Sequence, residues 1–87
     1  MTPLPASQPL VTGVQLGQLL KSARKRRKLT QAQVASHLGL SQNRVSYLEL
    51  HPDELSFKQL LGWCAAVGVE LRLSERTPAA SANSTEW

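Results

Sequence analysis

Residues 30–49, TQAQVASHLGLSQNRVSYLE, constrain the fold more than any other stretch of the chain. Thr30 can cap a helix by accepting a hydrogen bond from a backbone N–H of the first turn. Gly39 can end that helix, because the left-handed conformation of a residue just after a helix costs glycine almost nothing. Ser41 can then cap another helix over residues 42–50. Two helices joined by a tight glycine turn at this spacing predict a helix-turn-helix.

The second of these helices has one apolar face and one hydrogen-bonding face. With Val45 as the reference, a rotation of about 100° per residue puts Leu48 on the same side. The other side carries amide, guanidinium and hydroxyl groups. Because each base pair offers a distinct pattern of donors and acceptors in the major groove of DNA, such a face can read a sequence. We predict that DNA bases are read by Gln42, which can reach forward from the first turn, and by Asn43, Arg44, Ser46 and Tyr47.

The charge of the chain is unevenly distributed. Residues 1–48 contain seven basic residues and no acidic residue, whereas residues 49–87 contain three basic and six acidic residues, which together give the net charge of +4. A solvated helix face usually mixes both signs, so a concentrated positive half indicates a polyanion as the partner. Six of the cations lie within residues 21–28. Some of them complement the negative end of a helix dipole, but six exceed that need.

Backbone N–H groups at helix N-termini and nearby cations commonly hold phosphate oxygens and so position a protein on DNA. For Gln31 and Ser41, simple capping and solvation is the alternative interpretation. We predict that phosphate is contacted by Gln31, Ser41, Lys25, Arg27 and Lys28.

The remaining helices follow from apolar periodicity. Residues 1–11 contain three prolines and predict an extended or disordered lead. Thr12 should cap a first helix that runs to about Lys28, with the apolar stripe Leu16, Leu19, Leu20 and Ala23. Ser56 should cap a fourth helix that ends at Gly68, with the stripe Phe57, Leu60, Leu61 and Cys64.

The stretch VELRL, residues 69–73, alternates apolar and polar side chains and predicts one half-buried strand. A lone strand leaves its backbone groups unpaired, and a chain of 87 residues has a small core, so we expect pairing with the same strand of a second copy. Trp63 lies off the stripe of the fourth helix, and we expect it to be partly exposed. The predicted dimer interface consists of Val69, Leu71, Leu73 and Trp63.

These patterns divide the chain into a flexible lead (residues 1–11), a DNA-binding and dimerisation domain (residues 12–73) and a polar tail (residues 74–87). The tail cannot bury enough apolar area to offset its ordering entropy, so we expect it to be disordered. Trp87 packs against nothing in such a tail, and we predict that it contacts another protein, the alternative being that its position is accidental.

The stretch LTQAQVASHLGLSQNRVSYLE resembles the helix-turn-helix of the phage-repressor, or Xre, family, and the resemblance covers residues 13–68. It implies a mainly α fold, a lambda-repressor-like domain of four to five helices, which one short C-terminal β-strand would follow and pair across a homodimer. It implies that Gln31 contacts phosphate and that the exposed side of residues 41–47 faces DNA. It also implies a structural ion pair between Glu49 and Arg24.

A closer resemblance is to the HipB antitoxins, which place four helices before one dimer-pairing strand and finish with a disordered tail ending in Trp, as VELRL and STEW do here. It implies a dimeric transcriptional autorepressor of a type II toxin–antitoxin operon that binds a palindromic operator and a HipA-like kinase toxin. It also implies that the tail presents Trp87 to a protease. Asn43 and Arg44 depart from that family's recognition helix, so its operator sequence is not carried over.

Two other functions fit the sequence. One is a solitary Xre-type regulator without a toxin partner, and the other is a protein-interaction module whose basic face meets an acidic partner. An enzyme is not expected, because no nucleophile and base are suggested by spacing and no catalytic residue is assigned.

No cofactor or metal is expected. Cys64 stands alone, and its spacing from His37 and His51 matches no closed zinc pattern. The chain contains no apolar run of about 18 residues and no signal pattern, so we expect no membrane contact. With one unpaired cysteine, we expect a cytoplasmic protein. The resemblance to the HipB antitoxins implies a bacterial cytoplasm and association with the nucleoid when the protein binds DNA.

Overall fold

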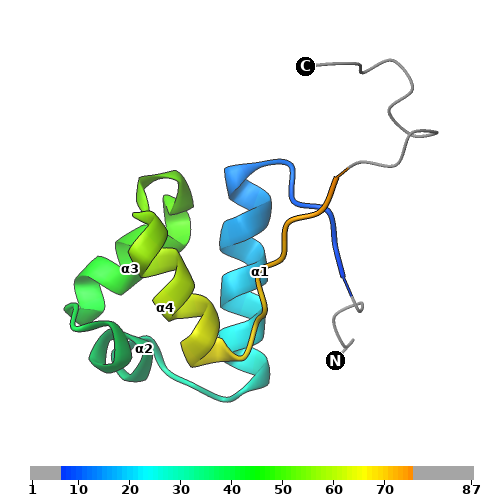
Figure 1. Cartoon of the computed structure of the whole chain (residues 1–87). Coiled ribbons are helices and arrows are strands. Elements are labelled where there is room, and N and C mark those ends of the chain that lie inside the picture. Colours follow the sequence, from blue (N-terminus) through cyan, green and yellow to red (C-terminus); the bar gives the residue numbers. More distant parts are fainter. Residues whose placement is uncertain (1–6, 76–87) are drawn as a thin grey trace.

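The computed structural model describes residues 7–75. Figure 1 shows α1 standing beside α2 and α3, with α4 lying between them in this view. Each of α3 and α4 contacts both α1 and α2, so the four helices share one core. The mainly α class that the sequence predicted is confirmed for the described residues. The elements are α1 (Gly13–Arg26), α2 (Gln31–Leu38), α3 (Gln42–Leu50), a 3₁₀ turn η1 (Pro52–Glu54) and α4 (Phe57–Val67).

Hydrogen-bonding caps fix the ends of the helices. The side chains of Thr12, Thr30, Ser41 and Ser56 each accept a hydrogen bond from the backbone N–H three residues later. For α2 and α4 a glutamine returns a second bond to the cap, which completes a capping box. Gly39 and Gly68 follow α2 and α4 with φ of 69° and 75°, the left-handed conformation predicted for them. These predicted boundaries are confirmed.

The end of α1 differs from its prediction. The helix stops at Arg26 rather than near Lys28, and Lys28 has a φ of 59°. The backbone N–H of Leu29 donates to the carbonyl of Arg24 at 3.0 Å, which closes the helix through a left-handed residue. Glycine usually occupies such a position, and another residue there costs roughly 1 kcal/mol. Charge and periodicity do not reveal this turn, because lysine is an ordinary helix residue.

The core shows that the predicted exposure of Trp63 was wrong. Trp63 is 0% exposed and is the largest fully buried side chain, so it does not form a surface of this chain for a second copy. By contrast, Phe57 is 68% exposed although it was assigned to the apolar stripe of α4. The buried stripe starts one turn later, at Leu60, and continues through Trp63, Cys64 and Val67. Both stripes satisfy the same helical spacing, and burying tryptophan removes more apolar area from water.

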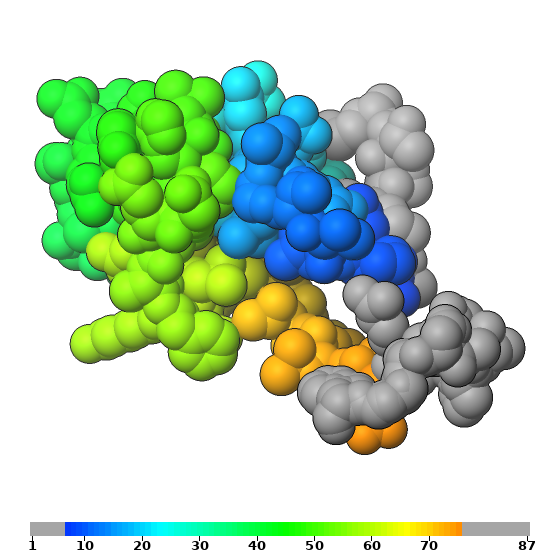
Figure 2. Space-filling model, turned by 90° about the horizontal axis from the view of Figure 1, so that it is seen from above, coloured from blue at the N-terminus to red at the C-terminus, as the bar shows by residue number. Residues whose placement is uncertain are grey.

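A close backbone contact joins α1 to the segment after α3. A Cβ atom at Gly17 would lie 2.7 Å from the carbonyl oxygen of Glu49 and 3.1 Å from Cγ of Pro52. Pro52 is buried, and η1 packs against α1. In Figure 2, seen from above, the start of α1 lies beside the part of the chain around the end of α3.

Residues at the two ends of the described chain have no regular secondary structure. Residues 9–11 are held to α1 by Gln15, which accepts from the N–H of Val11 at 2.7 Å and donates to the carbonyl of Pro9 at 2.8 Å. Residues 69–75 lead from α4 back toward the end of the molecule where α1 begins (Figure 1). Residues 1–6 and most of the predicted tail, including Trp87, lie outside the described residues.

No strand occurs within residues 7–75 of the single chain. Val69 packs against the core, whereas Leu73 is 97% exposed. A strand needs a neighbour to accept and donate its backbone hydrogen bonds, and the described residues provide none. Pairing of residues 69–73 with a second copy therefore stays a prediction.

Candidate nucleic-acid interface

The outward face of α3 is anchored by a fully buried inner face. Val45 and Leu48 are both 0% exposed, so the helix cannot rotate without opening the core. Gln42, Asn43 and Arg44 are exposed, and Ser46 is half-buried. Within residues 7–75 the side chains of Gln42, Asn43 and Ser46 make no hydrogen bond. Their donors and acceptors are free to meet an external partner.

Tyr47 differs from the other predicted base-reading residues because its side chain is engaged. Its hydroxyl donates to Oε2 of Glu54 at 2.6 Å, and its ring stacks on His51 with 4.3 Å between centroids. The guanidinium carbon of Arg44 lies 5.4 Å from the centre of the same ring. The hydrogen bond to Glu54 raises the pKa of the Tyr47 hydroxyl, which therefore stays protonated. No sequence signal indicates this contact, because Glu54 follows a proline that interrupts helical periodicity.

A buried ion pair joins α1 to α3 close to the start of α2. The Nε atom of Arg24 lies 2.6 Å from Oε2 of Glu49, and the two side chains are 10% and 3% exposed. Nη2 of Arg24 donates to the second carboxylate oxygen at 3.2 Å, so the pair is bidentate. Nη1 donates to the carbonyl of Leu29 at 3.0 Å and holds the loop between α1 and α2. The resemblance implied this pair, and the structure forms it between α1 and α3.

Gln31 joins the same network. Its amide nitrogen donates to Oε1 of Glu49 at 3.0 Å, so the carboxylate receives three hydrogen bonds from α1 and α2. An amide group has two N–H donors, and the second is left for an external acceptor. The sequence and its resemblance predict separate roles for Gln31 and Glu49. Their contact was not foreseen because periodicity assigns residues to faces but does not pair side chains across helices.

The other residues predicted to contact phosphate lie in two places. Ser41 caps α3 by accepting from the N–H of Arg44 at 3.1 Å, and its hydroxyl hydrogen remains available. Lys25 and Lys28 are exposed at the end of α1. Arg27 is also exposed, but its guanidinium lies against Gly68, where a Cβ atom would collide with it. The guanidinium of Arg27 therefore packs against the end of α4.

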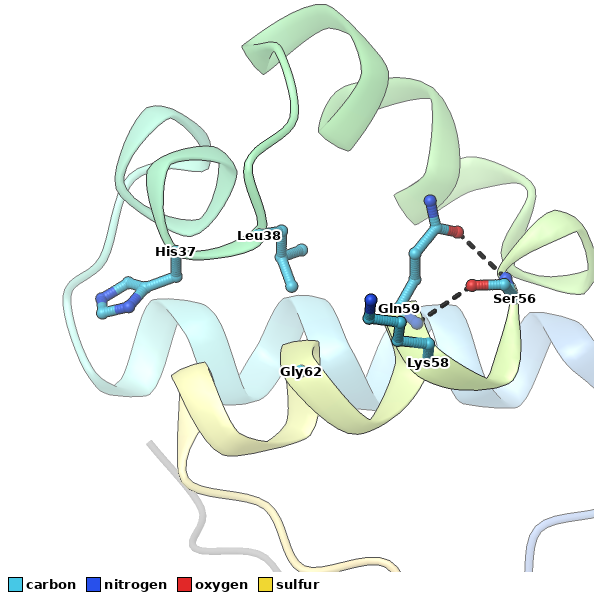
Figure 3. Close-up of a pocket in the computed structure, with 6 residues that line it drawn as sticks. All are labelled: His37, Leu38, Ser56, Lys58, Gln59 and Gly62. Atoms are coloured by element: carbon cyan, nitrogen blue, oxygen red, sulfur yellow. Dashed lines mark hydrogen bonds between the residues drawn. The ribbon is translucent and has the colours of Figure 1, made fainter.

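A shallow hollow lies between α2 and the start of α4 (Figure 3). Gly62 allows α2 to approach closely, because a Cβ there would lie 3.0 Å from Cδ2 of Leu38. Two of the polar groups in the hollow, Ser56 and Gln59, are used in the capping box of α4. The remaining polar residues are His37 and Lys58, and we assign no ligand to the hollow.

Residues 7–75 contain no group of three His, Cys, Asp or Glu side chains that could hold a metal ion. Cys64 is a buried free thiol, and burial raises its pKa. Across the described part of the chain, none of the helices has both the length and the apolar character needed to cross a bilayer.

Comparisons with known proteins agree with this geometry. Residues 15–50 match a family model described as a helix-turn-helix domain, which covers α2, α3 and most of α1. The chain carries a helix-turn-helix. No curated protein is similar enough to count as a match.

Solved structures show the same fold. A chain of a HipA–HipB–O2–O3 complex has a TM-score of 0.73 and 21% identity, with 82% of this chain and 100% of that chain covered. A chain from a complex of a HipB variant with an O2 20mer has a TM-score of 0.73 and 22% identity, with 83% and 100% covered. A structure named MDT Protein gives a TM-score of 0.73 at 21% identity. The helix-turn-helix fold and its likeness to HipB are confirmed.

Proposed function

We propose that this protein is a dimeric, sequence-specific DNA-binding repressor and the antitoxin of a type II toxin–antitoxin module. It would bind a palindromic operator and neutralise a HipA-like kinase toxin. The observation that carries the proposal is the outward face of α3, where free donors and acceptors stand on a helix fixed by a fully buried inner face. The toxin half of the proposal is supported by the shared fold with a chain of a complex that contains both HipA and HipB.

Roles can be assigned from the available donors and acceptors. Arg44 is suited to guanine, and Gln42 and Asn43 are suited to adenine. Ser46 can contact either kind of base. Phosphate would be held by the free N–H of Gln31, the hydroxyl of Ser41, and the side chains of Lys25, Arg27 and Lys28.

Binding to DNA has a salt test. Phosphate contacts release counterions, so raising salt from roughly 50 to roughly 200 mM should weaken binding by orders of magnitude. A flat response in a filter-binding or fluorescence-anisotropy titration would refute the DNA interface. Absence of DNA binding even at low salt would favour the protein-interaction module.

The division between reading and anchoring residues has its own test. Arg44→Ala should relax preference at particular base pairs, at about 1 to 3 kcal/mol each. Lys25→Ala should weaken binding to all sequences alike and lower the salt slope by about 1. A uniform loss of affinity in both variants would show that the division is wrong.

The dimer is proposed to form through residues 69–73 of two chains. Two recognition helices related by a two-fold axis would then reach successive major grooves about 34 Å apart. Leu71→Pro removes a backbone donor from the shared strand, so DNA affinity should become dependent on protein concentration. A tight, unchanged dimer in sedimentation equilibrium would place the interface elsewhere.

The toxin partner is tested by isolating the protein from its native cells and weighing what accompanies it. A kinase-sized partner in a stoichiometric complex supports the antitoxin. DNA with no protein partner would leave a solitary regulator.

Comparison with a chain lacking residues 74–87 would show whether the tail and Trp87 affect the lifetime of the protein in those cells.

A further inference from the structure

Three side chains form a row along the exposed side of α3 and the residue that follows it. Arg44, Tyr47 and His51 are spaced by three and then four residues, the separations at which helical side chains meet. The tyrosine ring lies in the middle, stacked on His51 and flanked by the guanidinium of Arg44 at 5.4 Å from its centre. The position of the Tyr47 ring therefore limits the positions that the guanidinium of Arg44 can occupy.

The far end of that ring is held by a different element. The Tyr47 hydroxyl donates to the carboxylate of Glu54 at 2.6 Å, a charge-assisted hydrogen bond. Glu54 belongs to η1, whose backbone is closed by bonds from Glu54 N–H to the carbonyl of His51 at 3.0 Å and from Leu55 N–H to that of Pro52 at 3.1 Å. Pro52 is buried and lies close to Gly17 of α1, so the backbone of the turn that carries Glu54 is fixed.

We propose that Glu54 is a specificity-determining positioning residue, which holds Tyr47 and thereby restricts Arg44 to conformations suited to a base contact. The proposal rests on the proposed DNA binding, and it gives Tyr47 a supporting role in place of direct base reading. An arginine held by a ring loses less conformational freedom when it meets a base edge. A misplaced guanidinium loses the geometry that separates guanine from other bases.

The charge of Glu54 separates positioning from simple attraction. A carboxylate close to bound DNA repels phosphate, so on charge alone its removal strengthens binding to every sequence. If Glu54 also positions Arg44, its removal weakens the preference for the correct base pair at the same time. Stronger overall binding with weaker discrimination is the signature of the proposed role.

The probe is double-stranded DNA. A preferred sequence is first selected from a random library with the wild-type protein, and affinities are then measured for that sequence and for each single-base-pair change. Arg44→Ala identifies the base pair that depends on Arg44. At that base pair we expect discrimination to fall about three- to tenfold in Tyr47→Phe and in Glu54→Ala. The double variant should fall no further than either single variant, because both remove the same bond.

Tyr47→Phe and Asp53→Asn separate the effect of the hydrogen bond from the effect of negative charge. The first keeps the ring and the charge of Glu54 but removes the hydrogen bond, so its affinity for random DNA should not rise as that of Glu54→Ala does. The second removes a neighbouring charge on the same turn and leaves the Tyr47 bond in place. It should raise affinity for all sequences and keep discrimination intact. Urea unfolding of each variant confirms that the fold is retained.

Full discrimination in Tyr47→Phe overturns the proposal, and so does an equal loss of discrimination at every base pair. Failure of the proposed function is a separate result, since it would be seen when the wild-type protein selects no sequence from the library. That result would come before any variant is compared.

Discussion

Removing Arg24 is expected to destabilise the protein far more than removing a surface arginine. Glu49 is 3% exposed and receives two of its three hydrogen bonds from Arg24. Arg24→Ala would leave a buried carboxylate with only the amide of Gln31. Breaking a buried pair in this way typically costs about 3 to 5 kcal/mol. That loss is a large share of the stability of a small domain, which is of the order of 5 to 15 kcal/mol.

The chain contains a matched control. Arg72 and Glu70 form an ion pair at 3.1 Å, with side chains 76% and 74% exposed. Arg72→Ala should cost less than about 1 kcal/mol, because exposed pairs gain little in water. Thermal unfolding followed by circular dichroism, at one fixed protein concentration, separates the two. At roughly 4 °C or more per kcal/mol, Arg24→Ala should lower Tm by at least about 12 °C.

A double variant tests the physical reason. Arg24→Met with Glu49→Leu removes both charges, and such replacements are often neutral or stabilising, so much of the lost stability should return. The DNA affinity of this variant should be lower than that of the wild type, because Gln31 has lost the carboxylate that holds its amide. If Arg24→Ala lowers Tm no more than Arg72→Ala does, the burial argument is refuted.

Other predictions concern backbone and thiol sites. Gly17→Ala should destabilise the protein by about 1 to 3 kcal/mol in urea unfolding, because its Cβ would lie 2.7 Å from a backbone carbonyl. The control is Gly62→Ala, whose Cβ would lie 3.0 Å from the end of a flexible side chain. An effect of Gly17→Ala no larger than that of the control would contradict the prediction. Lys28→Gly should stabilise the fold by about 0.5 to 1 kcal/mol, because it removes a lysine from the left-handed conformation. The same change should weaken DNA binding if Lys28 contacts phosphate. An unchanged urea midpoint would argue against strain at residue 28. The thiol of Cys64 ionises at higher pH in the folded than in the unfolded chain, so raising pH through about 8.5 should lower stability, and Cys64→Ala should lose less over the same range.

Much of the fold could be predicted because local chemistry determines it. Caps at Thr30, Ser41 and Ser56 and left-handed glycines at residues 39 and 68 depend only on neighbouring backbone groups, and their sequence signals are strong. The burial of Trp63 could not be predicted in the same way. Two stripes with equal spacing run along α4, and the packing of α1, α2 and α3 decides between them.

The candidate site was predictable as a set of residues but not as a set of contacts. Helical periodicity places Asn43 and Arg44 on the outside of α3, and both are exposed in the structure. The bonds from Gln31 to Glu49 and from Tyr47 to Glu54 join different elements. Spacing along one helix carries no information about such contacts, because they depend on how separate elements meet.

The contrast between free and engaged side chains on α3 bears on how new DNA preferences can evolve. Within residues 7–75, Gln42, Asn43 and Ser46 make no side-chain hydrogen bond, so most replacements there should alter stability by less than about 0.5 kcal/mol. Mutation can therefore explore new operators at these positions while the fold stays intact. Glu49 has no such freedom, because one carboxylate serves both the core and Gln31. Under the proposed function, a lineage of such proteins would change its operators quickly while its contacts to the DNA backbone stay the same.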